Sequence, residues 1–185
     1  MRIISGELGG RKIKSPATYD VRPTSDKVKE AIFSMLIPFM HEDFIAVDLF
    51  AGSGNMGIEA ISRGAKTVYF SDNSRQSLAL VKENLEICRV ADRGILLSGD
   101  YKLNIRRVRE KADIFFLDPP YADKFILPAL DIIAEEDNLN SGGVVVCEHS
   151  HKDVLPEEYG PFTAIKDRRY GAIGVTVYQY NKEQA

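Results

Sequence analysis

Hydrophobic positions follow two alternating patterns from about residue 44 to residue 147. Short apolar runs typical of buried strands occupy residues 44–49, 67–71, 94–97, 113–117 and 144–147. Between them, apolar residues recur every three or four positions over residues 56–63, 74–88, 101–110 and 124–136, which is the spacing of amphipathic helices. Strands that alternate with helices of this length predict a parallel sheet covered by helices on both faces.

The two ends of the chain depart from this pattern. Residues 163–168 and 173–180 are strand-like runs around Tyr170-Gly171, with no room for a helix, and predict a closing antiparallel hairpin. Residues 2–4 and 12–14 predict two short strands of a hairpin that turns at Gly6 and Gly9-Gly10. The expected fold is α/β, with a mostly parallel seven-stranded sheet, a C-terminal antiparallel hairpin and a small N-terminal β-hairpin and helix extension.

The first helix follows Arg22-Pro23. Thr24 or Ser25 can cap it, apolar residues recur at helical spacing to Leu36, and Pro38 ends it. We divide the chain into a basic N-terminal hairpin arm, residues 1–23, and a single domain, residues 24–185. Residues 1–30 hold seven Lys or Arg against four acids. This charge suits either a solvated edge hairpin that resists aggregation or an arm that contacts phosphate groups.

Composition narrows the classes of function. The chain has 185 residues and a net charge of −3, so binding to nucleic acid would need a local basic patch. The two cysteines, Cys88 and Cys147, form no Cys-x-x-Cys pair, and His41, His149 and His151 lack metal-ligand spacing. We expect no metal. Because no apolar run approaches the ~20 residues of a membrane span and no signal-peptide pattern is present, we expect a cytoplasmic protein.

A glycine-rich stretch follows the first predicted strand of the alternation. Its spacing is Gly52-x-Gly54-x-x-Gly57, and the second strand ends at Asp72. Glycines let the backbone turn sharply and approach a ligand, and a carboxylate at Asp72 can accept both hydroxyls of a ribose. The same spacing fits a dinucleotide site, so these residues alone indicate only a nucleoside cofactor.

Asp48 favours a positively charged nucleoside cofactor over a dinucleotide. It ends the first strand, four residues before Gly52, where the pyrophosphate of a dinucleotide would be repelled. A cofactor that carries a sulfonium and an ammonium group tolerates an acid there. We therefore expect S-adenosylmethionine, with a nicotinamide cofactor or an empty structural loop as alternatives. Asp100 and Tyr101 follow the third strand and are placed to contact adenine, although Asp100 also suits a helix cap. The candidate cofactor-binding residues are Asp48, Phe50, Gly52, Gly54, Gly57, Asp72, Asn73, Asp100 and Tyr101.

The run Asp118-Pro119-Pro120-Tyr121 directly follows the apolar strand 114–117. Proline cannot donate to a sheet, so the chain leaves the sheet at Asp118 and places a carboxylate, rigid carbonyls and an aromatic ring at the strand's carboxyl end. The alternative is a plain Asp-Pro turn. We take Asp118, Pro119, Pro120 and Tyr121 as the candidate catalytic residues.

With these residues, the chain resembles the class I S-adenosylmethionine-dependent methyltransferases that modify exocyclic amines, whose fold is Rossmann-like. The blocks 2–6, 22–33 and 48–54, with Arg169-Tyr170-Gly171, are similar to the RsmD-type 16S ribosomal RNA guanine-N2 methyltransferases. The resemblance implies methyl transfer to the N2 amine of a guanine in small-subunit ribosomal RNA, as RNA or in its assembly particle. Separately, we expect a monomer. The candidate RNA-binding residues are Arg11, Lys12, Arg22 and Lys27.

Two features depart from the resemblance. Asn55-Met56 replaces the small residues expected within the glycine-rich loop. The acidic net charge leaves RNA binding to local patches, either the N-terminal arm or residues 101–111, whose five Lys and Arg also suit a solvated helix face. Alternative functions are DNA adenine-N6 or protein-glutamine amine methylation, and a non-catalytic RNA-binding assembly factor.

Overall fold

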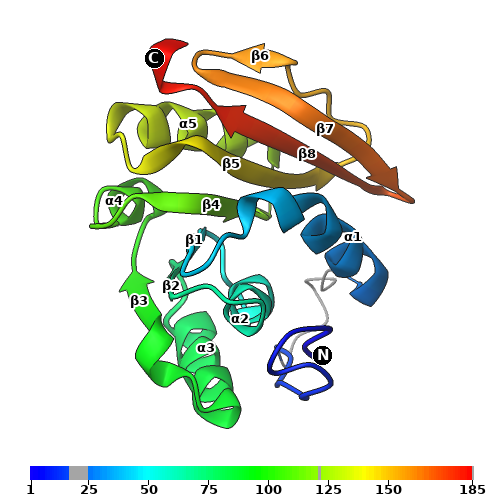
Figure 1. The fold of residues 1–185 in the computed structure, drawn as a ribbon, viewed down its shortest axis with the longest axis vertical. Helices are drawn as coiled ribbons and strands as arrows, with labels where there is room; N and C mark the ends of the chain where they lie inside the picture. The colour runs from blue at the N-terminus through cyan, green and yellow to red at the C-terminus, as the bar shows by residue number, and fades with distance from the viewer. Residues whose placement is uncertain (17–24, 121, 185) are drawn as a thin grey trace.

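The computed structural model describes residues 1–16, 25–120 and 122–184. They form one eight-stranded sheet with the order β3-β2-β1-β4-β5-β8-β7-β6 (Figure 1). The strands are Ile45–Asp48 (β1), Thr67–Asp72 (β2), Gly94–Ser98 (β3), Ala112–Leu117 (β4), Leu139–Ser150 (β5), Glu158–Tyr159 (β6), Phe162–Tyr170 (β7) and Ile173–Tyr180 (β8). Seven of them are the predicted strands, and β6 is a two-residue addition at the edge.

The sheet is parallel from β3 to β5 and antiparallel from β5 to β6. β1 pairs in parallel with β2 on one side and with β4 on the other. β8 lies antiparallel between β5 and β7, so the predicted closing hairpin is confirmed. The order of the strands reverses between β1 and β4.

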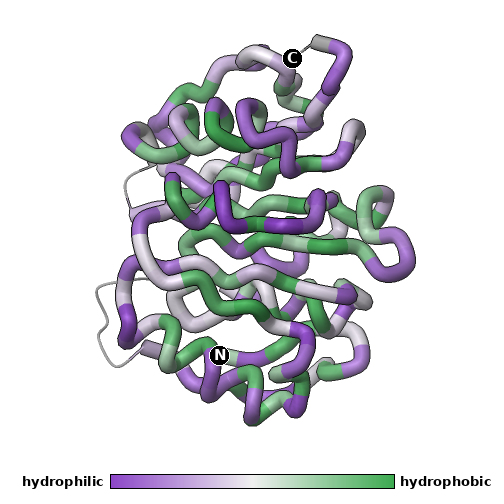
Figure 2. The backbone as a smooth tube through the Cα atoms, turned by 90° about the vertical axis from the view of Figure 1, so that its left-hand side faces the viewer, coloured by the Kyte–Doolittle hydropathy of each residue, from purple (hydrophilic) through white to green (hydrophobic). Residues whose placement is uncertain are grey.

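Over the part of the chain that the structure describes, five α-helices cover the two faces of the sheet. They are Asp26–Leu36 (α1), Asn55–Ser62 (α2), Arg75–Cys88 (α3), Tyr101–Ile105 (α4) and Ala122–Glu135 (α5). Short 3-10 turns follow α1 at Ile37–Phe39, precede β3 at Ala91–Arg93 and follow β8 at Lys182–Gln184. Buried side chains of α1, α2 and α3 share one hydrophobic cluster, and those of α4 and α5 share another. Figure 2 shows hydrophobic residues gathered along the inner strands and hydrophilic residues around them. The predicted parallel sheet between two helical layers is confirmed.

Local sequence explains where the helices begin. The Ser25 side chain accepts a hydrogen bond from the backbone N–H of Val28 and caps α1, as predicted. Ser74 caps α3 in the same way. No helix among the described residues is both long enough and apolar enough to cross a membrane.

α4 is shorter than predicted. It ends at Ile105 rather than near residue 110. Beyond it the chain closes i→i+3 turns, with the N–H of Val108 donating to the carbonyl of Ile105 at 3.2 Å. The side chain of Asn138 donates to the same carbonyl at 2.8 Å, and Val108 is buried. The carbonyl of Ile105 is thus bonded by a tighter turn and by Asn138, so the α-helix ends where periodicity would continue it.

The predicted N-terminal hairpin forms around one antiparallel bridge, between Arg2 and Lys12, with backbone hydrogen bonds from the N–H of Ile3 to the Arg11 carbonyl at 2.9 Å and from the N–H of Ile13 to the Met1 carbonyl at 3.1 Å. Residues 1–16, here called the amino-terminal segment, also pack onto α2 and α3. Ile3, Leu8 and Ile13 are buried in the first hydrophobic cluster. This burial holds the segment against the domain in addition to the backbone hydrogen bonds within it.

Candidate functional site

The candidate site lies where the strand order reverses, at the carboxyl ends of β1 and β4. Ligands of open α/β sheets bind at such a position. Asp48 is the last residue of β1, Asp72 is the last residue of β2, and Asp118 directly follows β4. The three aspartates singled out in the sequence therefore end three adjacent strands at one edge of the sheet.

Asp48 is an almost fully buried carboxyl group, only 4% exposed. Burial raises its pKa to about 7, and the charges of Asp118 and Asp72 act in the same direction. The backbone N–H of Gly57 donates to Asp48 Oδ2 at 2.9 Å and opposes this rise. A buried acid among other acids favours a ligand that carries positive charge.

Asp118 is exposed at the rim, and Pro119 behind it is buried. Desolvation by the surrounding protein raises the pKa of Asp118 above that of an ordinary aspartate. The peptide that follows is rigid because both next residues are prolines. Tyr121, the fourth candidate catalytic residue, lies outside the described residues.

Asp72 connects the end of β2 to the glycine-rich loop. Its Oδ2 accepts a hydrogen bond from the N–H of Gly52 at 2.9 Å, and its Oδ1 accepts one from Ser74 at 2.8 Å. Gly52 has φ +56°, and a Cβ there would meet nothing within 4 Å. The loop therefore leaves open space beside Gly52. A carboxylate can accept further hydrogen bonds, so Asp72 keeps capacity for a ligand hydroxyl.

The other two glycines have different environments. Gly54, with φ +79°, is the N-cap residue directly before α2. A Cβ on Gly57 would lie 2.2 Å from Cε1 of Phe70, so close packing requires glycine there. Gly57 also donates to Asp48, as noted above. These contacts give Gly57 a supporting place behind the loop, and its direct contact with a cofactor stays a prediction.

Asn55, one of the two departures within the loop, has a structural partner. Its Oδ1 accepts a hydrogen bond from Lys29 Nζ at 2.8 Å. Lys29 is fully buried and also pairs with Glu59 at 3.0 Å. The side chain of Asn55 thus serves the packing of α1 against α2.

Three aromatic rings gather at the same edge of the sheet. The ring centroid of Tyr101 lies 5.5 Å from that of Phe50 and 5.4 Å from that of Phe125. Asp100, beside them, caps α4 through the N–H of Lys102 at 2.9 Å, which confirms the helix-cap alternative without excluding an adenine contact. Phe125 was not among the candidates. In the sequence, the only indication of its role was that an aromatic residue lies near the start of the predicted helix after Tyr121.

Asn104 is a second residue that the sequence did not single out. It is fully buried, and its Nδ2 donates to Ser71 Oγ, to the carbonyl of Leu97 and to the carbonyl of Gly99 at 2.9–3.1 Å. It therefore joins the ends of β2 and β3 beneath Asp100. A polar residue on a short helix gives no indication of such partners.

A profile of the family described as conserved hypothetical protein 95 matches residues 1–179. The chain belongs to this family. The ribosomal RNA small subunit methyltransferase D of Haemophilus influenzae is 30% identical over 185 residues, which cover 97% of this chain and 93% of that protein. YlbH of Bacillus subtilis strain 168, named as a candidate rRNA methyltransferase, is 36% identical over 182 residues, or 97% of this chain and 98% of that protein. The predicted RsmD-type resemblance is confirmed.

A solved structure supports the fold independently. YhhF of Escherichia coli, named as a candidate methyltransferase, has a TM-score of 0.85 at 24% identity, and the match covers 98% of each chain. At that identity the likeness concerns the fold alone. The predicted Rossmann-like class I methyltransferase fold is confirmed.

The candidate RNA-binding residues differ in whether their side chains already have partners within the protein. Arg11 donates from its guanidinium to the carbonyls of Cys88 at 2.9 Å and Ile87 at 3.4 Å, at the end of α3. Lys12 and Lys27 are exposed. Arg22 lies outside the described residues. Arg11 thus has a helix-capping contact that its place in a basic stretch did not predict.

Side chains of the second basic stretch, residues 101–111, pair with acids that directly follow α5. Arg106 pairs with Glu136 at 2.8 Å, and Lys111 pairs with Asp137 at 2.8 Å. Arg107 donates to the carbonyl of Ser98 at 3.0 Å. These pairings favour the alternative that the stretch is a solvated, charge-balanced surface.

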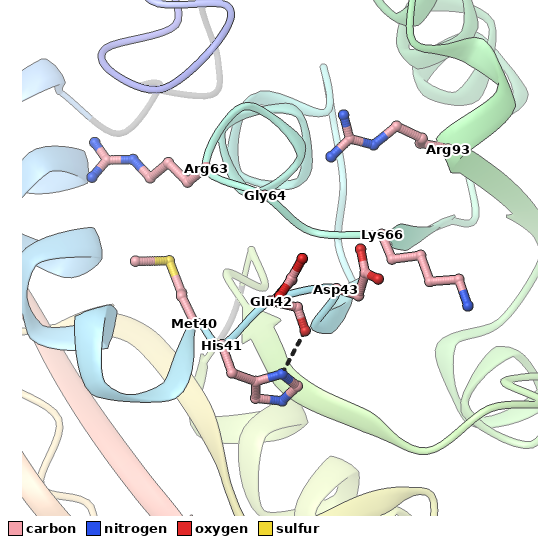
Figure 3. Close-up of a pocket in the computed structure, with 8 residues that line it drawn as sticks. All are labelled: Met40, His41, Glu42, Asp43, Arg63, Gly64, Lys66 and Arg93. Atoms are coloured by element: carbon pink, nitrogen blue, oxygen red, sulfur yellow. Dashed lines mark hydrogen bonds between the residues drawn. The ribbon is translucent and has the colours of Figure 1, made fainter.

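An open cavity of about 620 Å³ lies near the amino ends of β1 and β2, at the other end of the strands from the candidate site. It is lined by Met40, His41, Glu42, Asp43, Arg63, Gly64, Lys66 and Arg93. Figure 3 shows the charged ends of Arg63 and Lys66 pointing to opposite sides, so they do not converge on one ligand. In the described ranges no group of three or more His, Cys, Asp or Glu side chains is arranged to hold a metal ion.

Proposed function

We propose that this protein transfers the methyl group of S-adenosylmethionine to the N2 amine of a guanine in small-subunit ribosomal RNA. One observation supports the choice of cofactor: three acidic side chains stand at the ends of adjacent strands, beside an open glycine-rich loop. A sulfonium and an ammonium group suit this charge, whereas a pyrophosphate would be repelled. The relatives named as ribosomal RNA small subunit methyltransferases support the substrate.

The residues present fit the proposed cofactor. Asp72 would accept the ribose hydroxyls, with Asn73 exposed next to it. Asp100 would accept from the adenine amine, and the rings of Phe50, Tyr101 and Phe125 would supply its apolar surroundings. When bound, the cofactor supplies an electrophilic methyl group at the edge where Asp118 lies.

Asp118 and the Pro119 carbonyl would each accept one N–H of the guanine amine. The lone pair of such an amine is delocalised into the ring, so these two acceptors favour a more tetrahedral nitrogen and stabilise the positive charge that develops on it. The prolines keep the acceptors in place, which is an effect of orientation. Because the pKa of Asp118 is raised, its carboxylate is also a better acceptor for the proton that the amine loses after transfer. Tyr121 would stack on the base.

The test is transfer of a tritiated methyl group to small-subunit RNA, both naked and in assembly particles, followed by nucleoside analysis. The expected product is labelled N2-methylguanosine. The same assay includes DNA and total protein as acceptors. Label found only in DNA or in protein would overturn the proposed substrate, and failure of the protein to bind S-adenosylmethionine would revive a non-catalytic role in assembly.

A further inference from the structure

The glycine-rich loop turns at the peptide between Ser53 and Gly54. Ser53 lies between Gly52 and Gly54, which both have positive φ, +56° and +79°. Glycine tolerates either sign of φ, so steric hindrance alone does not hold the peptide between Ser53 and Gly54 in one orientation. The N–H of that peptide, on Gly54, donates to the carbonyl of Ala51 at 2.7 Å. A group that donates to its carbonyl, on Ser53, would hold the orientation from the other end.

Asn84 on α3 is that group. Its Nδ2 donates to the carbonyl of Ser53 at 2.9 Å and to the carbonyl of Lys14 at 3.0 Å. Its Oδ1 accepts from the N–H of Lys14 at 2.8 Å. One side chain therefore joins the loop to the amino-terminal segment, from the side of the loop that faces α3.

The burial of Asn84 indicates that these bonds matter. It is fully buried among apolar residues of α3 such as Val81, Leu85 and Cys88. A buried amide costs free energy unless its polar atoms are bonded, so packing alone would favour an apolar residue here. Both amide hydrogens and the oxygen have partners, and one of those partners belongs to the loop.

A second, independent connection lies on the other side of Gly54. Lys29 Nζ donates to Asn55 Oδ1 and to the carbonyl of Arg2, both at 2.8 Å. The amino-terminal segment is thus connected to the residues immediately before and after Gly54. Two buried polar side chains, from α3 and from α1, make these connections.

We propose that Asn84 is a positioning residue for the cofactor. It holds the Ser53–Gly54 peptide in the orientation that receives S-adenosylmethionine, and it makes the amino-terminal segment part of that support. The inference rests on the proposed function for the identity of the ligand. It assigns Asn84 no contact with the cofactor or the reacting atoms.

The test compares Asn84→Ala with Glu83→Ala. Glu83 is the neighbouring residue on α3, and its carboxylate pairs with the ammonium group of Lys14, so it also connects the amino-terminal segment to α3 but does not reach the loop. Calorimetric titration with S-adenosylmethionine, well below the unfolding temperature of each variant, should give a Kd about 10-fold higher for Asn84→Ala. The change for Glu83→Ala should be under about 2-fold.

Two further measurements separate positioning from general stability. Hydrogen exchange over residues 50–57, without cofactor, should be faster in Asn84→Ala and unchanged in Glu83→Ala. The KM for S-adenosylmethionine should rise while the KM for RNA stays near that of the wild type. A lower melting temperature with wild-type Kd and wild-type loop exchange would overturn the inference.

Asn84→Asp covers the case in which the alanine variant does not fold. It keeps the size of the side chain and an acceptor for the N–H of Lys14, but a carboxylate oxygen then faces the carbonyls of Ser53 and Lys14. The same rise in Kd and in loop exchange is expected, and wild-type values would overturn the inference. If the wild-type protein itself fails to bind S-adenosylmethionine, the proposed function falls, and the exchange comparison still decides whether Asn84 holds the loop.

Discussion

Two groups of charged side chains each centre on a buried carboxyl group at α2, Glu59 within the helix and Asp48 bonded to Gly57, and the groups differ in charge balance. In the first group, Glu59 is fully buried and pairs with Lys29 at 3.0 Å and with Arg63 at 2.9 Å. The N–H groups of Ile4 and Ser5 also donate to its carboxylate at 2.8 and 3.0 Å. Every charge in this group has a partner of the opposite sign, so the group holds α1, α2 and the amino-terminal segment together.

The group at the carboxyl ends of the strands has charges of one sign only. Asp48 is buried beside Asp72 and Asp118, and both neighbours raise its pKa further. Such an arrangement costs stability in the protein alone, and a cation removes the cost. The difference separates a structural network, which is complete within the chain, from the candidate site, which we propose a ligand of opposite charge completes.

The largest expected effect is on the balanced group. Lys29→Met removes the donor to Asn55 Oδ1 and to the carbonyl of Arg2 and takes one of two cationic partners from buried Glu59. It should lower the free energy of unfolding by about 3–5 kcal/mol. Urea denaturation measures this. Lys66→Met, at an exposed lysine, is the matched control and should stay within about 0.5 kcal/mol of the wild type. A loss below about 1 kcal/mol in Lys29→Met would show that the network is dispensable.

Asp118→Ala should act on chemistry and leave stability largely unchanged. Loss of a fixed acceptor for the amine should reduce kcat about 100- to 1000-fold, while calorimetry still detects binding of S-adenosylmethionine. Asp118→Asn is the matched control, because its amide oxygen can still accept one N–H, and it should retain intermediate activity. Near-normal kcat in Asp118→Ala would remove Asp118 from the site.

Asp72→Ala should weaken cofactor binding. The variant loses the acceptor for Gly52 and Ser74 and the proposed acceptor for the ribose, so Kd should rise about 10- to 100-fold. Asp92→Ala, at an exposed aspartate before β3, is the control and should bind as the wild type does. Equal affinities by calorimetry would contradict the ribose role.

The smallest expected effect is a dependence on pH. Asp48, with a pKa raised to about 7, is ionised above that pH and mostly protonated below it. A cation should therefore bind more weakly as pH falls from 8 to 6, by up to about 10-fold. In the ligand-free protein the raised pKa also means that stability falls as pH rises through 7. Asp48→Asn should flatten both profiles, and a wild-type affinity that does not change between pH 6 and 8 would exclude Asp48 from cation binding.

The unbalanced group was predictable from sequence because its members are local features. Asp48, Asp72 and Asp118 each follow an apolar strand, and parallel strands end at one edge. The glycine spacing and the prolines after Asp118 act on the backbone beside them, so their consequences are also local.

The balanced group was not predictable in this way, because its partners are distant in the chain. Lysine is a residue type that is rarely fully buried, yet Lys29 of α1 is fully buried against Glu59. Arg11, expected to face RNA, donates to Cys88 at the end of α3.

The sequence by itself therefore determined the order of strands and helices, the reversal of chain direction in the final hairpin and the three aspartates at the strand ends. The reason is that periodicity and turn chemistry depend on neighbouring residues. Only the tertiary structure decided which buried polar groups pair, that α4 ends at Ile105, and that Asn84 reaches Ser53. Those outcomes depend on which side chains the packing of distant segments brings within hydrogen-bond distance. A local sequence pattern does not contain that information.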